Sequence, residues 1–210
     1  MTKKAQQILD VLDTLFPNAT VELTHSNTYE LLVAVILSAQ ATDVSVNKVT
    51  PQLFKAYPTI TSLSKAEESD VQDLIKSIGL YKTKAKNIIL MANQVIERHN
   101  GIIPGNRKDL EALAGVGRKT ANVILSNAFN VPVIAVDTHV HRVSIRLGIA
   151  KKTDNVNQTE QKLYKMFPKD RYTKLHHQLI FFGRYHCLAR NPKCKNCPLY
   201  DICVYPEKTA

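Results

Sequence analysis

Apolar residues recur along most of the chain at the three- and four-residue spacing of amphipathic helices. The first such segment ends at Pro17, because proline cannot continue a helix. Residues 29–39 are apolar almost throughout, which predicts a buried helix; their β-branched members would also fit a strand, but no partner strand follows. The apolar face of the first segment consists of Ile8, Leu9, Leu12, Leu15 and Phe16.

The remaining patterns are also helical. The clearest covers residues 84–99, and Gly101 is placed to end it, as Gly79 is for the helix before it. Because we find no Asn-Gly hairpin between alternating strands, we predict that the chain is all-α. The other expected helices cover, in chain order, residues 46–54, residues 71–78, and segments that begin after Asn157 and after Asp170.

Composition and charge narrow the class of protein. Of the 210 residues, 44% are hydrophobic, which indicates folded structure rather than disorder. The formal net charge of +10 favours a polyanionic partner, although a basic protein without nucleic acid fits charge alone equally well. The N-terminus lacks the apolar core of a signal peptide, and the longest apolar run, residues 31–37, is too short to span a bilayer. We therefore expect an intracellular, cytoplasmic protein with no membrane partner.

Four cysteines near the C-terminus form the most specific motif, with the spacing Cys-x6-Cys-x2-Cys-x5-Cys. Loops this short let four thiolates converge on one metal centre. Structural zinc usually uses paired Cys-x2-Cys units, and this segment has one such unit, so the spacing favours an iron–sulfur cluster over zinc by about two to one. Disulfides come third, because nothing in the sequence directs export. The predicted ligands are Cys187, Cys194, Cys197 and Cys203.

The cysteine segment is also basic, since Arg184, Arg190, Lys193 and Lys195 surround the predicted ligands. A solvated face is the ordinary explanation for such charges. In a loop whose backbone is fixed by a metal, the same cations are candidates to hold DNA phosphates.

A Gly-x-Gly pair, Gly115 and Gly117, lies between a short apolar helix and a longer one. Such a pair permits a tight reversal and exposes backbone N–H groups at the start of the second helix, where a DNA phosphate would be favoured. Most such pairs are merely turns. Lys119 strengthens the functional interpretation. A cation in the first turn opposes the helix dipole, so helix stability does not explain why a lysine lies there. Its neutral amine would be a nucleophile, whereas the ordinary alternative is a solvent-facing lysine.

Asp137 follows an apolar stretch and begins another predicted helix. Aspartate is a favoured N-cap, so a purely structural role is a strong alternative. The two roles are compatible, because a capping carboxylate can also face a cleft. His139 and His141 do not share a helix face, which argues against a metal site there.

The Gly-Val-Gly-Arg-Lys-Thr-Ala string, the Val-Asp-Thr-His string and the cysteine spacing occur together in this order along the chain. The combination resembles the endonuclease III family of DNA glycosylases and lyases, in the helix-hairpin-helix superfamily, and the resemblance extends from Tyr29 to Cys203. It implies two helical domains with a DNA-binding cleft between them. A six-helix domain would span residues 23–132, and a domain with a [4Fe-4S] cluster would combine residues 1–22 and 133–210.

The resemblance also assigns roles. Lys119 would attack the sugar C1′, and Asp137 would lie across the cleft. Gln40 would fill the gap left by a flipped nucleotide while Leu80 wedges from the other side, although Leu80 fits an ordinary helix-capping contact nearly as well. The family hairpin usually reads Leu-Pro-Gly, and Ala114 replaces the proline here. Alanine can adopt the same backbone angles, so we expect a modest loss of pre-organisation, under about 1 kcal/mol.

The implied function is base excision repair. The protein would bind double-stranded DNA as a monomer at the nucleoid, remove oxidised pyrimidines, and cut 3′ of the abasic site through a lysine Schiff base. One alternative is an adenine-mismatch glycosylase of the same superfamily, which would carry glutamate where Val35 lies, no lysine at the hairpin, and an extra C-terminal domain. A second is a non-catalytic DNA-binding module with a structural metal, which leaves the combination of Lys119 and Asp137 unexplained.

Overall fold

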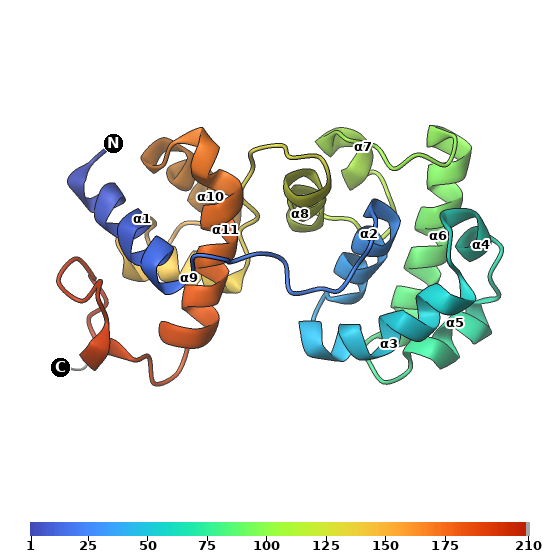
Figure 1. Cartoon of the computed structure of the whole chain (residues 1–210), viewed down its shortest axis with the longest axis horizontal. Helices are drawn as coiled ribbons and strands as arrows, with labels where there is room; N and C mark the ends of the chain where they lie inside the picture. Colours follow the sequence, from blue (N-terminus) through green and yellow to red (C-terminus); the bar gives the residue numbers. More distant parts are fainter. Residues whose placement is uncertain (209–210) are drawn as a thin grey trace. The chain divides into compact units, whose positions relative to one another are not determined.

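The computed structural model describes residues 1–208 of the chain. Every regular element in this described part is a helix, as Figure 1 shows, which confirms the predicted all-α class. The chain forms two compact units, one of residues 22–129 and the other of residues 1–21 together with 130–210. No helix in the described part is long and apolar enough to cross a membrane.

The unit of residues 22–129 is built around α2 (Thr28–Leu37) and α6 (Tyr81–His99). All residues from Leu31 to Leu37 are buried, as expected for a helix that is apolar on every side. α2 packs against α3 and α8, and α6 packs against α4 and α5 (Figure 1). The other helices are α3 (Asp43–Ala56), α4 (Ile60–Ser64), α5 (Glu68–Ile75), α7 (Arg107–Glu111) and α8 (Arg118–Ala128).

Helix ends in this unit agree with the sequence at one glycine and differ at another. Asn100 and Gly101 adopt left-handed backbone after α6, and the Gly101 N–H donates to the Val95 carbonyl, so the predicted stop is confirmed. The prediction that Gly79 ends the preceding helix is wrong. α5 ends at Ile75, a separate turn follows, and the left-handed residue in that turn is Leu80.

The second unit packs α1 (Lys3–Leu15), α9 (Thr138–Arg146), α10 (Val156–Met166) and α11 (Tyr172–Phe181) around a shared apolar core. A short 3₁₀ turn (Lys169–Arg171) precedes α11. A π-helical turn (Phe182–His186) extends α11, and a second 3₁₀ turn (Cys194–Asn196) lies within the cysteine segment. The core includes Ile8, Leu12, Val140, Leu163 and Leu179.

Asp13 ties α1 to α11 by polar contacts at the edge of this core. Its carboxylate accepts from Arg171 at 2.7 Å and from Gln178 at 2.9 Å, and it pairs with Lys174 at 2.8 Å. Burial raises the pKa of Asp13, but hydrogen bonds from Lys174, Arg171 and Gln178 outweigh burial and hold that pKa well below its ordinary value.

Candidate active site and metal centre

The Gly-x-Gly pair forms the turn between α7 and α8. Gly115 has left-handed backbone with φ 76°, and a Cβ built there would lie only 3.0 Å from Ile36 Cγ2 and 3.2 Å from Asn87 Cβ. Glycine is therefore required at residue 115 both by conformation and by close packing. Gly117 has extended backbone, so of these two glycines only Gly115 needs a positive φ.

Gly117 is the N-cap of α8, and no side chain caps this helix. The first turn contains no acidic residue; it begins with Arg118 and then the exposed Lys119. The opposite face of the helix is buried through Ala121 and Ile124, which fixes its direction. The start of α8 thus combines a glycine N-cap, the positive end of a helix dipole and an exposed amine. Such an arrangement suits a phosphate and a nucleophile close together.

Asp137 is the N-cap of α9. Its Oδ1 accepts from the Val140 N–H at 2.8 Å, and buried residues from Val133 to Val136 lead into it. Asp137 is half-buried, and the hydrogen bond from the Val140 N–H holds its carboxylate at the start of the helix that it caps. Burial lowers the pKa of the neighbouring His139, against the opposing effect of the Asp137 carboxylate.

Gln40 and Leu80 lie in two loops that meet. Both have left-handed backbone, with φ of 53° and 60°, which is uncommon for residues other than glycine. A Cβ built on Gly79 would lie 3.9 Å from the Gln40 carbonyl oxygen, so the loops are in contact. Leu80 precedes α6 without a side-chain capping bond and stays 57% exposed. Its side chain therefore gains little from packing in the free protein.

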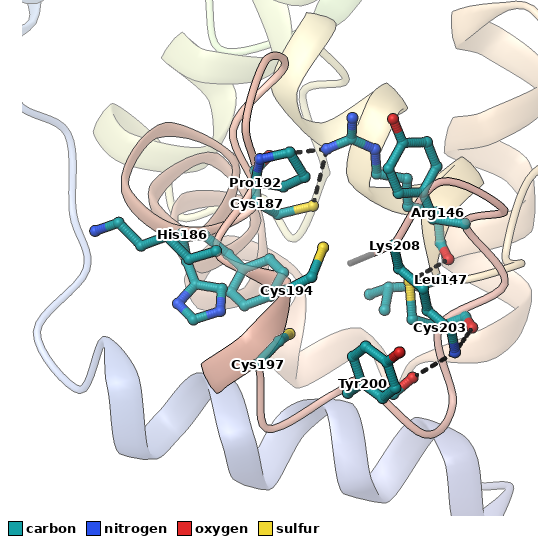
Figure 2. Close-up of a pocket in the computed structure, with 13 residues that line it drawn as sticks. Arg146, Leu147, His186, Cys187, Pro192, Cys194, Cys197, Tyr200, Cys203 and Lys208 are labelled. Carbon is teal, nitrogen blue, oxygen red and sulfur yellow. Dashed lines mark hydrogen bonds between the residues drawn. The ribbon is translucent and has the colours of Figure 1, made fainter. Parts of the chain in front are cut away.

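The four cysteines line one pocket in the second unit. None forms a disulfide, and Figure 2 shows their sulfur atoms around a shared space. The π-helical turn delivers the first of them, because the Cys187 N–H donates to the Phe182 carbonyl at 2.6 Å. The 3₁₀ turn carries Cys194. The predicted ligands are thus brought together by backbone turns as well as by short spacing.

The chemistry of this pocket fits an iron–sulfur cluster. Within residues 1–208, no three Cys, His, Asp or Glu side chains are placed to hold a single metal ion. All four thiols instead line one shared pocket, whose lining also includes the apolar Leu147 and Phe182. Burial raises the pKa of the Cys187 thiol, and the adjacent Arg146 opposes that rise. A nearby cation favours the thiolate, which is the form that ligates iron.

Arg146 was not predicted from the sequence. It is 6% exposed, and its guanidinium donates to the carbonyls of Leu188 at 2.6 Å and Ala189 at 3.2 Å. The guanidinium also donates to Cys187 Sγ at 3.3 Å (Figure 2). It also stacks over the Tyr205 ring at 4.1 Å. The sequence did contain a signal for its burial, because Arg146 lies about one helical turn after Val143, on the apolar face of α9.

The predicted basic residues of the cysteine segment differ in their surroundings. Arg184 is half-buried in the π-helical turn. Lys193 and Lys195 are exposed on either side of Cys194. Arg190 is exposed as well, so three of the four cations are accessible to a large anionic partner.

Comparisons with known proteins agree with this geometry. Residues 33–169 match the HhH-GPD superfamily of base excision DNA repair proteins, and residues 187–203 match the iron–sulfur binding domain of endonuclease III. The second match begins and ends at the first and last cysteines of the pocket. Fold and site together define a helix-hairpin-helix base excision repair protein with a C-terminal iron–sulfur domain.

Relatives specify the family within this class. The chain is 50% identical over 206 residues to "Endonuclease III" of Bacillus subtilis (strain 168), covering 98% of this chain and 94% of that protein. It is 49% identical over 205 residues to "Endonuclease III" of Escherichia coli (strain K12), covering 98% and 97%. The chain therefore belongs to the endonuclease III family. This confirms the predicted enzyme class, a base excision repair DNA glycosylase and lyase, and its [4Fe-4S] cofactor.

Solved structures show the same relationship. A trapped covalent endonuclease III–DNA intermediate has a TM-score of 0.91 and 49% identity, with 97% of each chain covered. A non-covalent endonuclease III–DNA complex has a TM-score of 0.93 and 48% identity, covering 97% of this chain and 96% of the other. A thermostable thymine-DNA glycosylase has a TM-score of 0.89 and 26% identity, covering 99% and 98%.

Proposed function

We propose that the protein binds double-stranded DNA, removes oxidised pyrimidines, and cuts the strand 3′ of the resulting abasic site. The observation that carries this proposal is the start of α8, where an exposed lysine lies in the first turn of a helix whose N-cap is a glycine and whose first turn holds no acidic residue. The endonuclease III structures similar to this chain are complexes with DNA, one of them covalent, which supports DNA as the partner.

In the proposed mechanism, the damaged nucleotide first leaves the stack, because C1′ cannot be reached within the duplex. The neutral Nζ of Lys119 then attacks C1′, and the base departs with the electron pair of the C1′–N bond. Opening of the sugar ring gives a Schiff base between Lys119 and C1′. This cation acidifies the C2′ proton; its removal breaks the C3′–O bond, and the 3′ phosphate leaves with the electron pair.

Asp137 is proposed to stabilise the positive charge that develops on the sugar, or to relay a proton. Its place as N-cap of α9 supports this role, because the Val140 N–H holds the carboxylate in one orientation. We also propose that the two units are the two domains expected from the sequence.

Gln40 is proposed to fill the space of the extruded nucleotide, with Leu80 as the wedge beside it. The contact between their loops and the left-handed backbone of both residues support this assignment. An exposed leucine gains more from insertion between bases than from its place in the free protein.

Phosphate binding is proposed for the N–H groups of Gly115 and Gly117 and for Arg184, Lys193 and Lys195. The ligands of the cluster are proposed to be the four cysteines of the pocket. The bound cluster supplies a thiolate-held centre that fixes the loop carrying these cations. Arg146 positions the start of that loop by binding its carbonyls. We further propose that the protein acts as a monomer in the cytoplasm, at the nucleoid where its substrate lies.

Incision of duplex DNA that contains one abasic site tests the proposal. Wild-type protein should cut the labelled strand 3′ of the site, and Lys119→Gln should bind the same duplex without cutting it. A protein that shifts the duplex but leaves it intact at every concentration would be a binding module, which would refute the proposed function.

A further inference from the structure

The hairpin turn is held from outside by the side of α6. The Ala114 N–H donates to Gln94 Oε1 at 2.7 Å, and both residues are half-buried. Asn87 lies on the same helix seven residues earlier and packs under Gly115, where a built Cβ would be 3.2 Å from Asn87 Cβ. Residues seven apart share one face of a helix, so two amide side chains of α6 meet two consecutive residues of the turn.

The hydrogen bond from the Ala114 N–H to Gln94 supplies an acceptor that the turn needs because residue 114 is alanine and not proline. Proline at residue 114 would fix its own φ and would carry no N–H, whereas alanine leaves φ unfixed and adds a half-buried donor. A buried N–H without an acceptor is unfavourable. A hydrogen bond to a neighbouring helix satisfies the N–H and at the same time restricts the conformation of the turn. The adjacent residue, Gly115, is the one with left-handed backbone. The Gln94 bond therefore acts at the residue that sets the direction of the reversal.

Asn93, the residue before Gln94 on α6, makes a different hydrogen bond. Asn93 donates to the carbonyl of Ile89 at 3.0 Å, within its own helix, as expected for a local side-chain bond. Gln94 instead reaches across twenty residues of sequence to the hairpin. Its contact is thus specific to the turn and is not a feature of every amide on α6.

We propose that Gln94 is a positioning residue for DNA binding. By accepting from Ala114, it fixes the turn that presents the N–H groups at the start of α8 to the DNA. This inference rests on the proposed role of the hairpin in holding DNA. Gln94 itself does not touch the DNA or the reacting atoms in this proposal; it acts through the backbone of the turn.

The test compares Gln94→Met, Gln94→Glu and the control Asn93→Met. Methionine keeps the length of the side chain and removes the amide acceptor, while glutamate keeps an acceptor in the same place. The Kd for a duplex with a tetrahydrofuran abasic analogue should rise about fivefold in Gln94→Met, the effect of losing one neutral hydrogen bond. KM for abasic-site incision should rise with Kd while kcat stays unchanged, because uniform binding is lost. Asn93→Met should keep the wild-type Kd, and Gln94→Glu should match wild type when both are compared at an ionic strength that screens the added charge.

Rescue separates positioning from general stability. Adding Ala114→Pro to Gln94→Met should restore the Kd, because proline fixes φ and needs no acceptor. An unchanged Kd in Gln94→Met, with or without a lower melting temperature, overturns the inference, as does a raised Kd that proline leaves unrestored. If wild-type protein does not bind the abasic-analogue duplex at all, the proposed function fails, and that result is distinct from failure of the Gln94 variants alone.

Discussion

Replacing Arg146 should release the beginning of the cysteine loop. In Arg146→Met, the buried aliphatic volume is largely kept, while the carbonyls of Leu188 and Ala189 lose a cationic donor. The Cys187 carbonyl is also held by Arg142 at 3.2 Å and is affected less. The Tyr205 ring loses the guanidinium that stacks on it. The change is therefore concentrated on the segment between the first two predicted ligands.

The size of the effect follows from these contacts. Two hydrogen bonds to a charged donor are each worth about 1.5–3 kcal/mol, and removal of a buried cation returns part of its desolvation cost. We expect a net loss of about 3 kcal/mol, which corresponds to a melting temperature lower by roughly 10 °C for a protein of this size. Because metal binding and loop folding are coupled, the variant should also retain less iron per chain.

The assay pairs iron content with thermal unfolding, each measured on Arg146→Met and on Arg190→Met. Arg190 is an exposed cation of the same loop, so its replacement controls for the change in charge. Arg146→Lys should fall between wild type and Arg146→Met, because an ammonium keeps the positive charge and some donors but lacks the planar fork of the guanidinium. If Arg146→Met matches Arg190→Met in both iron content and melting temperature, the reasoning is refuted.

Three further outcomes are expected. Asp137→Asn keeps a good N-cap and should unfold as wild type does, yet incise at least about 100-fold more slowly, whereas Asp137→Ala should also lose about 1 kcal/mol of stability; equal incision by Asp137→Asn would contradict the proposed role. Asp13→Asn should lower the melting temperature by about 2–4 °C near neutral pH, a discounted effect because the carboxylate is 34% exposed. Since the folded pKa of Asp13 lies below its ordinary value, this difference should persist above about pH 4 and shrink as the pH falls below it; melting curves across that range check the sign. Leu80→Ala should leave the melting temperature unchanged, because the side chain is exposed, and should weaken binding to lesion DNA more than to undamaged DNA in a titration of both.

Strong periodicity made much of the fold predictable. The buried stripe of α6 and the largely apolar α2 follow directly from the order of residues. The short helix α7 and the longer α8 bound the hairpin as expected. Weaker signals failed. α4 is five residues long and is fixed by a capping box between Thr59 and Ser62, and the pattern of apolar residues did not indicate it. The π-helical turn before Cys187 likewise leaves no periodic signature.

The candidate site also has features that the sequence predicted and features that it did not. Asp137 was predictable as an N-cap because residue preference at helix starts is local. The left-handed backbone of Gln40 and Leu80 was not, since their loops hold these residues in a conformation that neither prefers alone. The contacts of Gln94 and Arg146 were also missed, because each joins segments far apart in the chain and periodicity does not specify which polar atoms will meet.

Reduction with borohydride during turnover tests the central claim, that Lys119 is the nucleophile. Wild-type protein mixed with duplex DNA containing an oxidised pyrimidine should form a covalent protein–DNA adduct, because borohydride reduces the Schiff base to a stable amine. Lys119→Gln should form none, while the control Lys108→Gln, which replaces an exposed lysine on the other helix of the hairpin, should cross-link as wild type does. Peptide mapping of the wild-type adduct should place the DNA on Lys119. An adduct of undiminished yield in Lys119→Gln, or one mapped to another residue of the wild-type protein, would contradict the account.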